Sequence, residues 1–404
     1  MSGSKLDMCK ETLVVLLKEL KSTDRFALTI FHHEAEVVIP LNFLVGAARD
    51  LAINRVKLIE TQGCTNLSGG LTLAIGELQK CTTPNPVRSV LLLTDGHANR
   101  GVSSEDGILS LAKGCLGLSK DISVNVMGYG SDHNADLLQK ISQTSATAGS
   151  YYFIDTNENV SSAFGDCLGG LLSVSAQNIV MKVTGVPGVE VKHERATKLA
   201  DGSGWTVALG DMFAEESKDV VISGPYGTAT IECQIEYVDV IMSLPVVSDV
   251  VSCSVVQTST STLAPANAHV ALQHLRVAVV QAMKLANDMS RGDRMVEARA
   301  LMAGTLEDIA RTATELGSRL SEEDRSVISM ISMLTADCTD CLSSMTSYAE
   351  YEKAGSKKMM QKMQTHQAQR CNEASEETTN IYRGSAVSGK SRMARKFKGS
   401  VGLS

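Results

Sequence analysis

The sequence lacks the features of membrane proteins, secreted proteins and nucleotide-driven enzymes. No apolar run approaches the ~18 residues of a membrane-spanning helix, so we expect no transmembrane segment. The chain does not open with a signal peptide. The phosphate-cradling pattern Gly-x-x-x-x-Gly-Lys is missing, which argues against nucleotide-driven chemistry. These absences favour a soluble protein without an NTPase site.

The composition allows a large core. Hydrophobic residues make up 43% of the 404 residues and charged residues 21%, which predicts two or three folded domains. A net charge of -7 argues against broad binding to nucleic acid or membranes. The ten cysteines could form disulfides in a secreted protein, but we favour buried free thiols in a reducing compartment. We therefore expect a cytoplasmic protein.

The first part of the chain alternates helical and strand patterns. Predicted helices cover 6–20, 42–60, 66–79, 103–118, 135–147 and 159–172, and predicted strands cover 25–31, 36–41, 89–94, 123–128 and 151–155. The run 89–94 is continuously apolar, as expected for a strand buried on both faces. This order predicts an α/β fold with a doubly wound, mostly parallel, Rossmann-like sheet over residues 1–173.

The pattern changes near Ser173. Short β-rich segments fill residues 174–262, which predicts a small antiparallel β-sandwich. A Ser/Thr-rich linker leads to a helical region over 266–372, where apolar residues recur at helical spacing. Residues 373–404 lose this periodicity after about Tyr382 and are expected to form a disordered basic segment.

Polar residues cluster where the predicted strands end and helices begin. Ser2 and Ser4 precede the first helix. Thr65 precedes another helix, and Asp95 closes the strand 89–94. Loops at the carboxyl ends of strands converge on one crevice in such a sheet. Hydroxyl and carboxylate oxygens suit Mg²⁺, Mn²⁺ or Ca²⁺ better than zinc. The alternative is that the serines cap the first helix and Asp95 caps a turn.

These fragments resemble the metal-ion-dependent adhesion site (MIDAS) of von Willebrand factor A (vWA) domains. That family's motif is Asp-x-Ser-x-Ser, a distant Thr, and an Asp that ends the central strand. The matching fragments here are Ser2-Gly3-Ser4, Thr65 within Gly-x-Thr-x-x-x-x-Gly, and Thr94-Asp95-Gly96. The resemblance covers residues 1–172 in order and spacing.

The resemblance implies a role for each matching residue. Ser2 and Ser4 would be direct hydroxyl ligands of a divalent cation, and the resemblance favours Mg²⁺ as that cation. Thr65 would bind directly or through water, and Asp95 through water. Gly3 and Gly96 would support the metal-binding loops. In the family the metal keeps one position open for an Asp or Glu of the partner protein.

The sequence departs from the family at its start. The family's leading Asp would lie two residues before Ser2, and the central strand that carries it is missing as well. We interpret the chain as N-terminally truncated, with a natural short form as the alternative. Loss of one carboxylate should weaken cation binding. Loss of a central strand should expose unpaired backbone on both neighbouring strands.

A second resemblance covers roughly residues 175–350. The run from Leu209 to Asp219, with Gly210-Asp211-Met212-Phe213 and Glu215-Glu216, is similar to a turn that follows the vWA domain in two groups. These groups are the plant wavy-growth-type RING ubiquitin ligases and proteins with the intein-associated extension called Vwaint. We expect Glu215 and Glu216 to lie in a solvated acidic turn.

Other patterns favour ordinary structural roles. Cys338 and Cys341, with His366 and Cys371 further on, could form a zinc site, but buried thiols are the favoured interpretation. His32 and His33 are expected to be surface histidines. The basic residues of the last segment are Arg392, Arg395, Lys396 and Lys398, and without interleaved aromatic residues they predict a solvated tail rather than a specific nucleic-acid site.

We therefore predict a protein-interaction module that is not an enzyme. The favoured function is metal-assisted binding of Asp or Glu side chains on a protein partner. An alternative is the substrate-recognition part of a ubiquitin ligase whose RING domain is absent from this chain. A third possibility, intein-like self-processing, needs a nucleophile opening a β-rich segment with a downstream His and Asn, and the helical half offers none.

Overall fold

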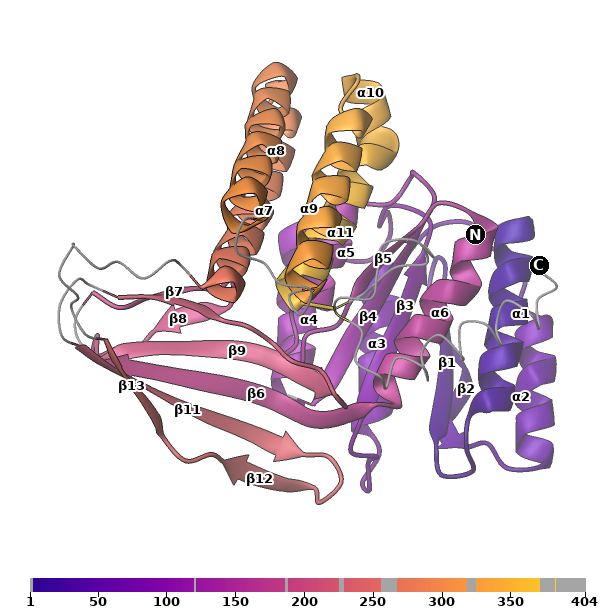
Figure 1. Ribbon diagram of the computed structural model, residues 1–404. Helices are drawn as coiled ribbons and strands as arrows, with labels where there is room; N and C mark the ends of the chain where they lie inside the picture. Colours follow the sequence, from indigo (N-terminus) through magenta and orange to yellow (C-terminus); the bar gives the residue numbers. More distant parts are fainter. Residues whose placement is uncertain are drawn as a thin grey trace, which may run out of the picture. The chain divides into compact units, whose positions relative to one another are not determined.

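A computed structural model describes residues 3–119, 121–185, 188–224, 229–255, 267–317, 325–370 and 382 (Figure 1). The chain divides into two compact units. Among the described residues, the first, which we call the α/β unit, covers 3–175, and the second, the β-helical unit, covers 176–370 together with Tyr382. Within the described ranges, no helix is both long and apolar enough to cross a membrane.

The α/β unit alternates helices and strands as the sequence predicts. Its helices are α1 (Ser4–Glu19), α2 (Ala47–Lys57), α3 (Leu67–Gln79), α4 (Glu105–Gly117), α5 (Ala135–Ser142) and α6 (Asn157–Leu171). Its strands are β1 (Arg25–Phe31), β2 (Ala35–Phe43), β3 (Arg88–Thr94), β4 (Ile122–Tyr129) and β5 (Tyr151–Ile154). The predicted helix 135–147 ends early, at Ser142, because the following residues turn back and Ser145 donates to a carbonyl oxygen of β4.

Helices cover both faces of this sheet, which confirms the doubly wound fold. On one face α1 and α6 pack together with apolar residues of β4 and β5 around Met127 and Phe164. On the other face α3, α4 and α5 pack side by side. All residues of β4 and β5 are buried. Burial on both faces fits the apolar residues of β5 and most of β4, and the buried Asn125 of β4 donates a hydrogen bond to Oγ of Ser89 at 2.9 Å.

The sheet of the α/β unit is divided into two parts. β3, β4 and β5 form a parallel sheet, whereas β1 and β2 form an antiparallel pair. Every residue of β1 is only half-buried, in contrast to β4. Among the described residues no strand lies between β1 and β3, so each has one unpaired edge. Backbone N–H and C=O groups on these two strand edges therefore have no strand partner within the described residues.

The β-helical unit begins with strands and continues with helices. Its strands are β6 (Val174–Gly185), β7 (Glu190–Lys192), β8 (Ala196–Lys198), β9 (Gly204–Phe213), β10 (Val221–Ser223), β11 (Ala229–Asp239), β12 (Leu244–Val247) and β13 (Val251–Val255). Its helices are α7 (Ala268–Arg291), α8 (Met295–Gly317), α9 (Arg325–Ser344), α10 (Tyr348–Glu350), the π-helical turn η3 (Tyr351–Gly355) and α11 (Ser356–Ala368).

The strands form two sheets of unequal size. Strands β8, β9, β6, β11, β12 and β13 make a six-stranded sheet, and β7 pairs with β10. Val183 and Val207 of the large sheet share one core with Val191 of the small sheet. The result is an asymmetric sandwich, in agreement with the predicted antiparallel β-domain. The helices form their own core around Met283, Met302 and Leu334.

The sequence predicts more domains than the two compact units of the structure. The strands and helices after residue 175 belong to one compact unit. Their division into separate domains at 174–262 and 266–372 therefore stays a prediction. The linker around Pro265 lies outside the described residues. The segment 373–404, with the exception of Tyr382, also lies outside them.

Candidate metal and partner-binding rim

Three loops meet at the carboxyl ends of the strands of the α/β unit. Asn66, the N-cap residue of α3, receives a hydrogen bond on its side chain from Gly69. Its backbone N–H donates to the carbonyl oxygen of His32 at 2.9 Å, and its amide group donates to that of His33 at 3.3 Å. The loop after β1 is therefore fastened to the start of α3, where the sequence predicts a helix to begin.

The loop after β3 is fastened to Thr65. The backbone N–H of Thr65 donates to Oδ1 of Asn99 at 2.8 Å, and the N–H of Asn99 donates back to the carbonyl oxygen of Thr65 at 3.1 Å. A methyl group built on Gly96 would lie 3.7 Å from Oγ1 of Thr65. The structure thus brings the Thr65 hydroxyl beside Gly96, the residue that follows Asp95.

The first turn of α1 lies at the same end of the strands. The ammonium group of Lys5 is 5.2 Å from the ring centroid of Tyr129, the last residue of β4. Burial raises the pKa of Cys9 in α1 to about 12, and the negative charge of Asp95 contributes to this rise, so the two side chains interact. Ser4 is the exposed first residue of α1.

The remaining predicted site residues have distinct outcomes. Gly3 occupies the N-cap position of α1 with a φ of 56°, a conformation that glycine adopts readily. Ser4 lies inside the helix, so the alternative in which Ser4 caps it is wrong. Ser2 lies outside the described residues. Thr65, Asp95 and Gly96 belong to the meeting loops.

The donor set has the chemistry of a hard-cation site. Within the described residues, no three His, Cys, Asp or Glu side chains are grouped so that they could hold a metal ion. A cation at the rim therefore needs hydroxyl oxygens, and among the predicted ligands Asp95 is the one carboxylate. Ser4 and Thr65 fit Mg²⁺, Mn²⁺ or Ca²⁺ in kind. One carboxylate gives little charge compensation, which predicts modest affinity.

Sequence reasoning missed a cysteine–histidine contact at this rim. Sγ of Cys64 lies 3.5 Å from Nε2 of His33. Cys64 has a φ of 67°, which is unusual for a residue other than glycine. The two residues are 31 positions apart in the sequence, so no local sequence pattern predicts this contact. His33 is exposed, as the prediction of a surface histidine requires.

The zinc interpretation of the cysteines in α9 finds no support in the geometry. Cys338 and Cys341 are buried, as the favoured interpretation holds. Burial raises the pKa of Cys338 to about 12, so its thiol stays protonated at neutral pH. Nε2 of His366 lies 2.9 Å from Oδ2 of Asp337 and is thereby engaged by a carboxylate. Cys371 lies outside the described residues.

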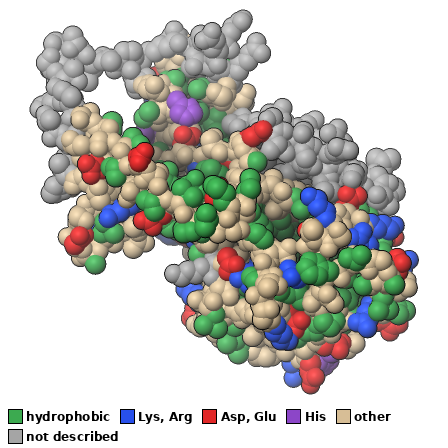
Figure 2. Space-filling view, turned by 90° about the horizontal axis from the view of Figure 1, so that it is seen from below, with side chains coloured by type: hydrophobic (Ala, Val, Ile, Leu, Met, Phe, Trp, Pro, Cys, Tyr) green, Lys and Arg blue, Asp and Glu red, His purple; other side chains and the backbone are tan. Residues whose placement is uncertain are grey.

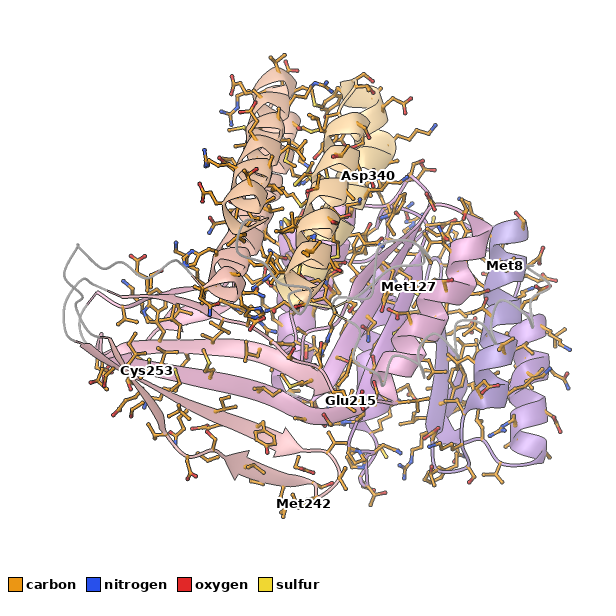
Figure 3. All side chains as sticks on the ribbon, in the orientation of Figure 1. Met8, Met127, Glu215, Met242, Cys253 and Asp340 are labelled. Atoms are coloured by element: carbon orange, nitrogen blue, oxygen red, sulfur yellow. The ribbon has the colours of Figure 1, made fainter. Side chains whose placement is uncertain are left out.

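The acidic motif of the β-helical unit is held inside the unit by an ion pair between Glu216 and Arg370, which we call the clamp. The prediction of a solvated turn is therefore wrong for Glu216. β9 continues through Phe213, and Glu215, labelled in Figure 3, forms the exposed turn. The side chain of Glu216 is 6% exposed and accepts hydrogen bonds from Arg370 at 2.6 and 3.0 Å. Arg370 also donates to the carbonyl oxygen of Asp211 and stacks 3.8 Å from the ring centroid of Phe213.

Buried charges surround this clamp. Nζ of Lys218 donates to the carbonyl oxygens of Leu209 at 2.9 Å and Asp211 at 3.1 Å. Burial, assisted by the positive charge of Arg370, lowers the pKa of Lys218 to about 7. Burial raises the pKa of Asp211 to about 6. The motif therefore joins the end of α11 to the β sheet within the same unit.

Comparison with known proteins identifies the class of the α/β unit. Residues 1–153 match the family described as von Willebrand factor type A domain. A structure of a von Willebrand factor type A protein from Catenulispora acidiphila superposes with a TM-score of 0.61 at 15% identity, over 80% of this chain and 77% of that one. The ArnB paralog VWA2 from Sulfolobus acidocaldarius gives 0.53 at 14% identity, over 91% and 85%. Residues 1–153 of the α/β unit are thus similar to von Willebrand factor type A domains, and the structural likeness shows a shared fold.

Curated relatives match parts of the chain. An uncharacterized protein of Synechocystis is 31% identical over 152 residues, which are 37% of this chain and 34% of the relative. The E3 ubiquitin-protein ligase WAV3 of Arabidopsis thaliana is 25% identical over 234 residues, 55% of this chain and 29% of the ligase. Inter-alpha-trypsin inhibitor heavy chain H3 of Homo sapiens is 30% identical over 149 residues, 35% and 16%. The chain thus spans about a third or less of the length of these relatives. The resemblance of its second part to the Vwaint extension stays a prediction.

Proposed function

We propose that the α/β unit holds a divalent cation at its rim and uses it to bind an acidic side chain of a protein partner. The contact between the Thr65 hydroxyl and the position next to Asp95 carries this proposal, because it joins two fragments that are 30 positions apart in the sequence. Similarity to vWA domains supports a role in protein interaction. In this proposal the chain binds and does not catalyse, and it acts in the cytoplasm.

Each rim residue has a defined task. The hydroxyl oxygens of Ser2, Ser4 and Thr65 would face the cation, and Asp95 would compensate its charge directly or through water. Gly96 keeps the space beside Thr65 free of a side chain. When bound, the cation supplies a positive charge with an exchangeable position that a carboxylate can occupy. Mg²⁺ is the favoured ion, and Mn²⁺ or Ca²⁺ also suit these ligands.

Mn²⁺ binding to the full chain tests the cation part of the proposal. Free Mn²⁺ is measured by electron paramagnetic resonance during a titration of the protein. We expect Asp95→Ala to abolish saturable binding, because it removes the carboxylate of the predicted ligand set. Asp50→Ala, a change at an exposed carboxylate of α2, serves as the matched control and should bind as the unchanged protein does. Equal binding by both variants would show that the rim is not the site.

A second candidate function is substrate recognition in a ubiquitin-ligase-related protein. The observation that favours it is the alignment with the ligase WAV3, which covers 234 residues and therefore exceeds the 153 residues of the family match. On this view the β-helical unit would be part of the recognition module. The test is ubiquitin transfer in a reconstituted reaction with an added RING domain fused to the chain. Failure to direct ubiquitin to any bound protein would leave the cation proposal intact and remove this one.

A further inference from the structure

The large sheet of the β-helical unit ends in a bulged edge strand. β13 pairs with the first half of β11 and β12 with its second half, both on the side away from β6. Between them Ser248 stays joined to β11, because its N–H donates to the carbonyl oxygen of Ile235 at 2.8 Å and its Oγ accepts from the N–H of Ile235 at 3.0 Å. β12 and β13 therefore follow one another along β11, with a bulge at residues 248–250. We call residues 229–255 the β11–β13 edge.

The outer side of β13 is open to another strand. Among the described residues, no strand pairs with β13 on the side away from β11. Its described side chains are all exposed, and they belong to Val251, Ser252, Cys253 and Ser254. β13 has none of the Pro or charged residues that discourage pairing at a sheet edge, whereas β12 contains Pro245, which has no backbone N–H. β13 is thus the part of the edge best suited to receive a strand from outside.

The two faces beside β13 differ in chemistry. Val251 and Cys253, the latter labelled in Figure 3, lie on the face that carries the sandwich core, because their partners on β11 pack against that core. On the opposite face Ser252 pairs with the exposed Glu232 of β11. A strand beyond β13 would lie about 10 Å from β11, two strand spacings away. Because Ser252 is small, a Lys or Arg of that strand could reach Glu232 across it.

Apolar and acidic side chains are exposed along this edge. Figure 2, which looks from below at the side where β11 and β12 lie in Figure 1, shows hydrophobic side chains gathered there. The exposed large apolar residues of the edge are Ile235, Ile241, Met242, Leu244, Val247, Val250 and Val251. The edge contains no Lys, Arg or His, and its acidic residues are Glu232, Glu236, Asp239 and Asp249.

The exposed carboxylates of the edge lack cationic partners. None of the ion pairs among the described residues involves Glu232, Glu236 or Asp249. Lys182 on β6 pairs with Gln234, so β11 lies between this cation and β13. An apolar surface with uncompensated negative charge favours a basic partner with apolar side chains of its own. A second copy of the edge is a poor occupant, because it would add four acidic residues and no cation.

We propose that β13 is a docking edge for an extended segment of a partner protein in which apolar and basic residues alternate. The segment pairs with the open side of β13 through backbone hydrogen bonds. Its apolar side chains cover Val251 and Cys253 on one face, and its Lys or Arg side chains face Glu232 on the other. This contact belongs to the β-helical unit alone and does not depend on the cation rim.

Fluorescence anisotropy with labelled peptides and the full chain tests this contact. The probe is a synthetic peptide in which Val and Lys alternate over about seven residues, within the usual length of a strand. We expect it to bind saturably. A peptide with Glu in place of every Lys should bind about tenfold more weakly, because its charges repel those of the edge. A Val-Lys peptide methylated on every backbone nitrogen keeps its charges but cannot donate hydrogen bonds to β13, and we expect it not to bind.

A charge reversal on the protein makes the test specific. Glu232→Lys should weaken binding of the Val-Lys peptide about fivefold, the upper range for an exposed ion pair, and should strengthen binding of the Val-Glu peptide. Glu307→Lys, at an exposed position of α8, changes the net charge equally and should leave both affinities unchanged. Circular dichroism establishes that both variants fold. Equal effects of the two variants would overturn the proposal, because they would show attraction by net charge alone.

Hydrogen exchange measured by mass spectrometry locates the bound peptide. Slower exchange of residues 251–255 in the presence of the Val-Lys peptide supports the proposal. Protection confined to other residues, equal binding by the methylated peptide, or no saturation up to about 1 mM peptide overturns it. Sedimentation velocity of the full chain alone distinguishes the other occupant. Self-association that protects residues 251–255 would show that a second copy occupies the edge, and it would overturn the proposal as well.

Discussion

Replacement of Arg370 is expected to destabilise the β-helical unit strongly. The side chains of Arg370 and Glu216 are 9% and 6% exposed, so their ion pair is buried. Burial alone would raise the pKa of Glu216, but the positive charge of Arg370 outweighs this effect and holds that pKa below its usual value. Arg370→Met keeps apolar contact with Phe213 but leaves Glu216 without its cation. Loss of one partner of a buried pair costs about 3–5 kcal/mol, and we expect a decrease of this size in the free energy of unfolding.

Tryptophan fluorescence during urea denaturation measures this decrease. Trp205, the only tryptophan of the chain, lies on β9, and its indole N–H donates to the carbonyl oxygen of Val189 at 2.8 Å. The probe therefore reports the unit that contains the clamp. Arg311→Met is the matched control, because Arg311 and Asp308 form an ion pair whose side chains are 69% and 58% exposed. Exposed pairs contribute at most about 1 kcal/mol.

A double substitution separates the charge from the packing. Combining Arg370→Met with Glu216→Leu removes both charges and should restore much of the lost stability, because no unpaired buried charge remains. The reasoning is refuted if Arg370→Met costs no more than Arg311→Met. It is also refuted if the double substitution is as unstable as the sum of its parts.

Three further predictions follow from burial and close contacts. Gly149→Ala should lower the melting temperature measured by circular dichroism, because the new methyl group would lie 1.9 Å from a carbonyl oxygen of β4. The control Gly114→Ala in α4 meets nothing within 4 Å and should be neutral or stabilising. Equal melting temperatures of the two variants would contradict this prediction. The pKa of Lys218 is about 7 in the folded chain instead of 10.5, so the free energy of unfolding should rise with pH between these two values. Lys218→Met should flatten this rise in urea titrations carried out across that pH range. An unchanged slope in the variant would exclude Lys218 as the cause of the rise. Iodoacetamide at pH 8 should modify the half-buried Cys64 well before the buried Cys9, and mass spectrometry showing the opposite order would refute it.

Much of the α/β unit could be predicted because its signals are local. The apolar run from Val90 to Leu93 predicts a strand, and it lies in β3, whose residues are buried or half-buried. Asn66 marks the start of α3 by its capping side chain. The individual strands β8 and β12 could not be predicted from the sequence, because strands of three or four largely exposed residues show no alternation of apolar and polar positions.

Contacts between distant residues could not be predicted from one sequence. Glu216 follows a turn and reads as solvated, but its partner Arg370 is 154 positions later. Cys64 and His33 likewise meet only through the fold. At the rim the structure places Gly96 beside Thr65, and Asn99 holds the Thr65 loop in place. Local sequence patterns thus predict the helices and strands that border the rim. The hydrogen bonds that hold the rim loops together join residues far apart in the sequence and could not be predicted.

The position of a bound cation tests the central claim most directly. Mn²⁺ broadens nuclear magnetic resonance signals of nearby amides, and substoichiometric Mn²⁺ can be added to chains labelled selectively at threonine, glycine and arginine. We expect the signals of Thr65 and Gly96 to broaden first, while that of Arg88, at the opposite end of β3, stays sharp. Uniform broadening, or broadening centred away from Thr65 and Gly96, would contradict a cation site on this rim.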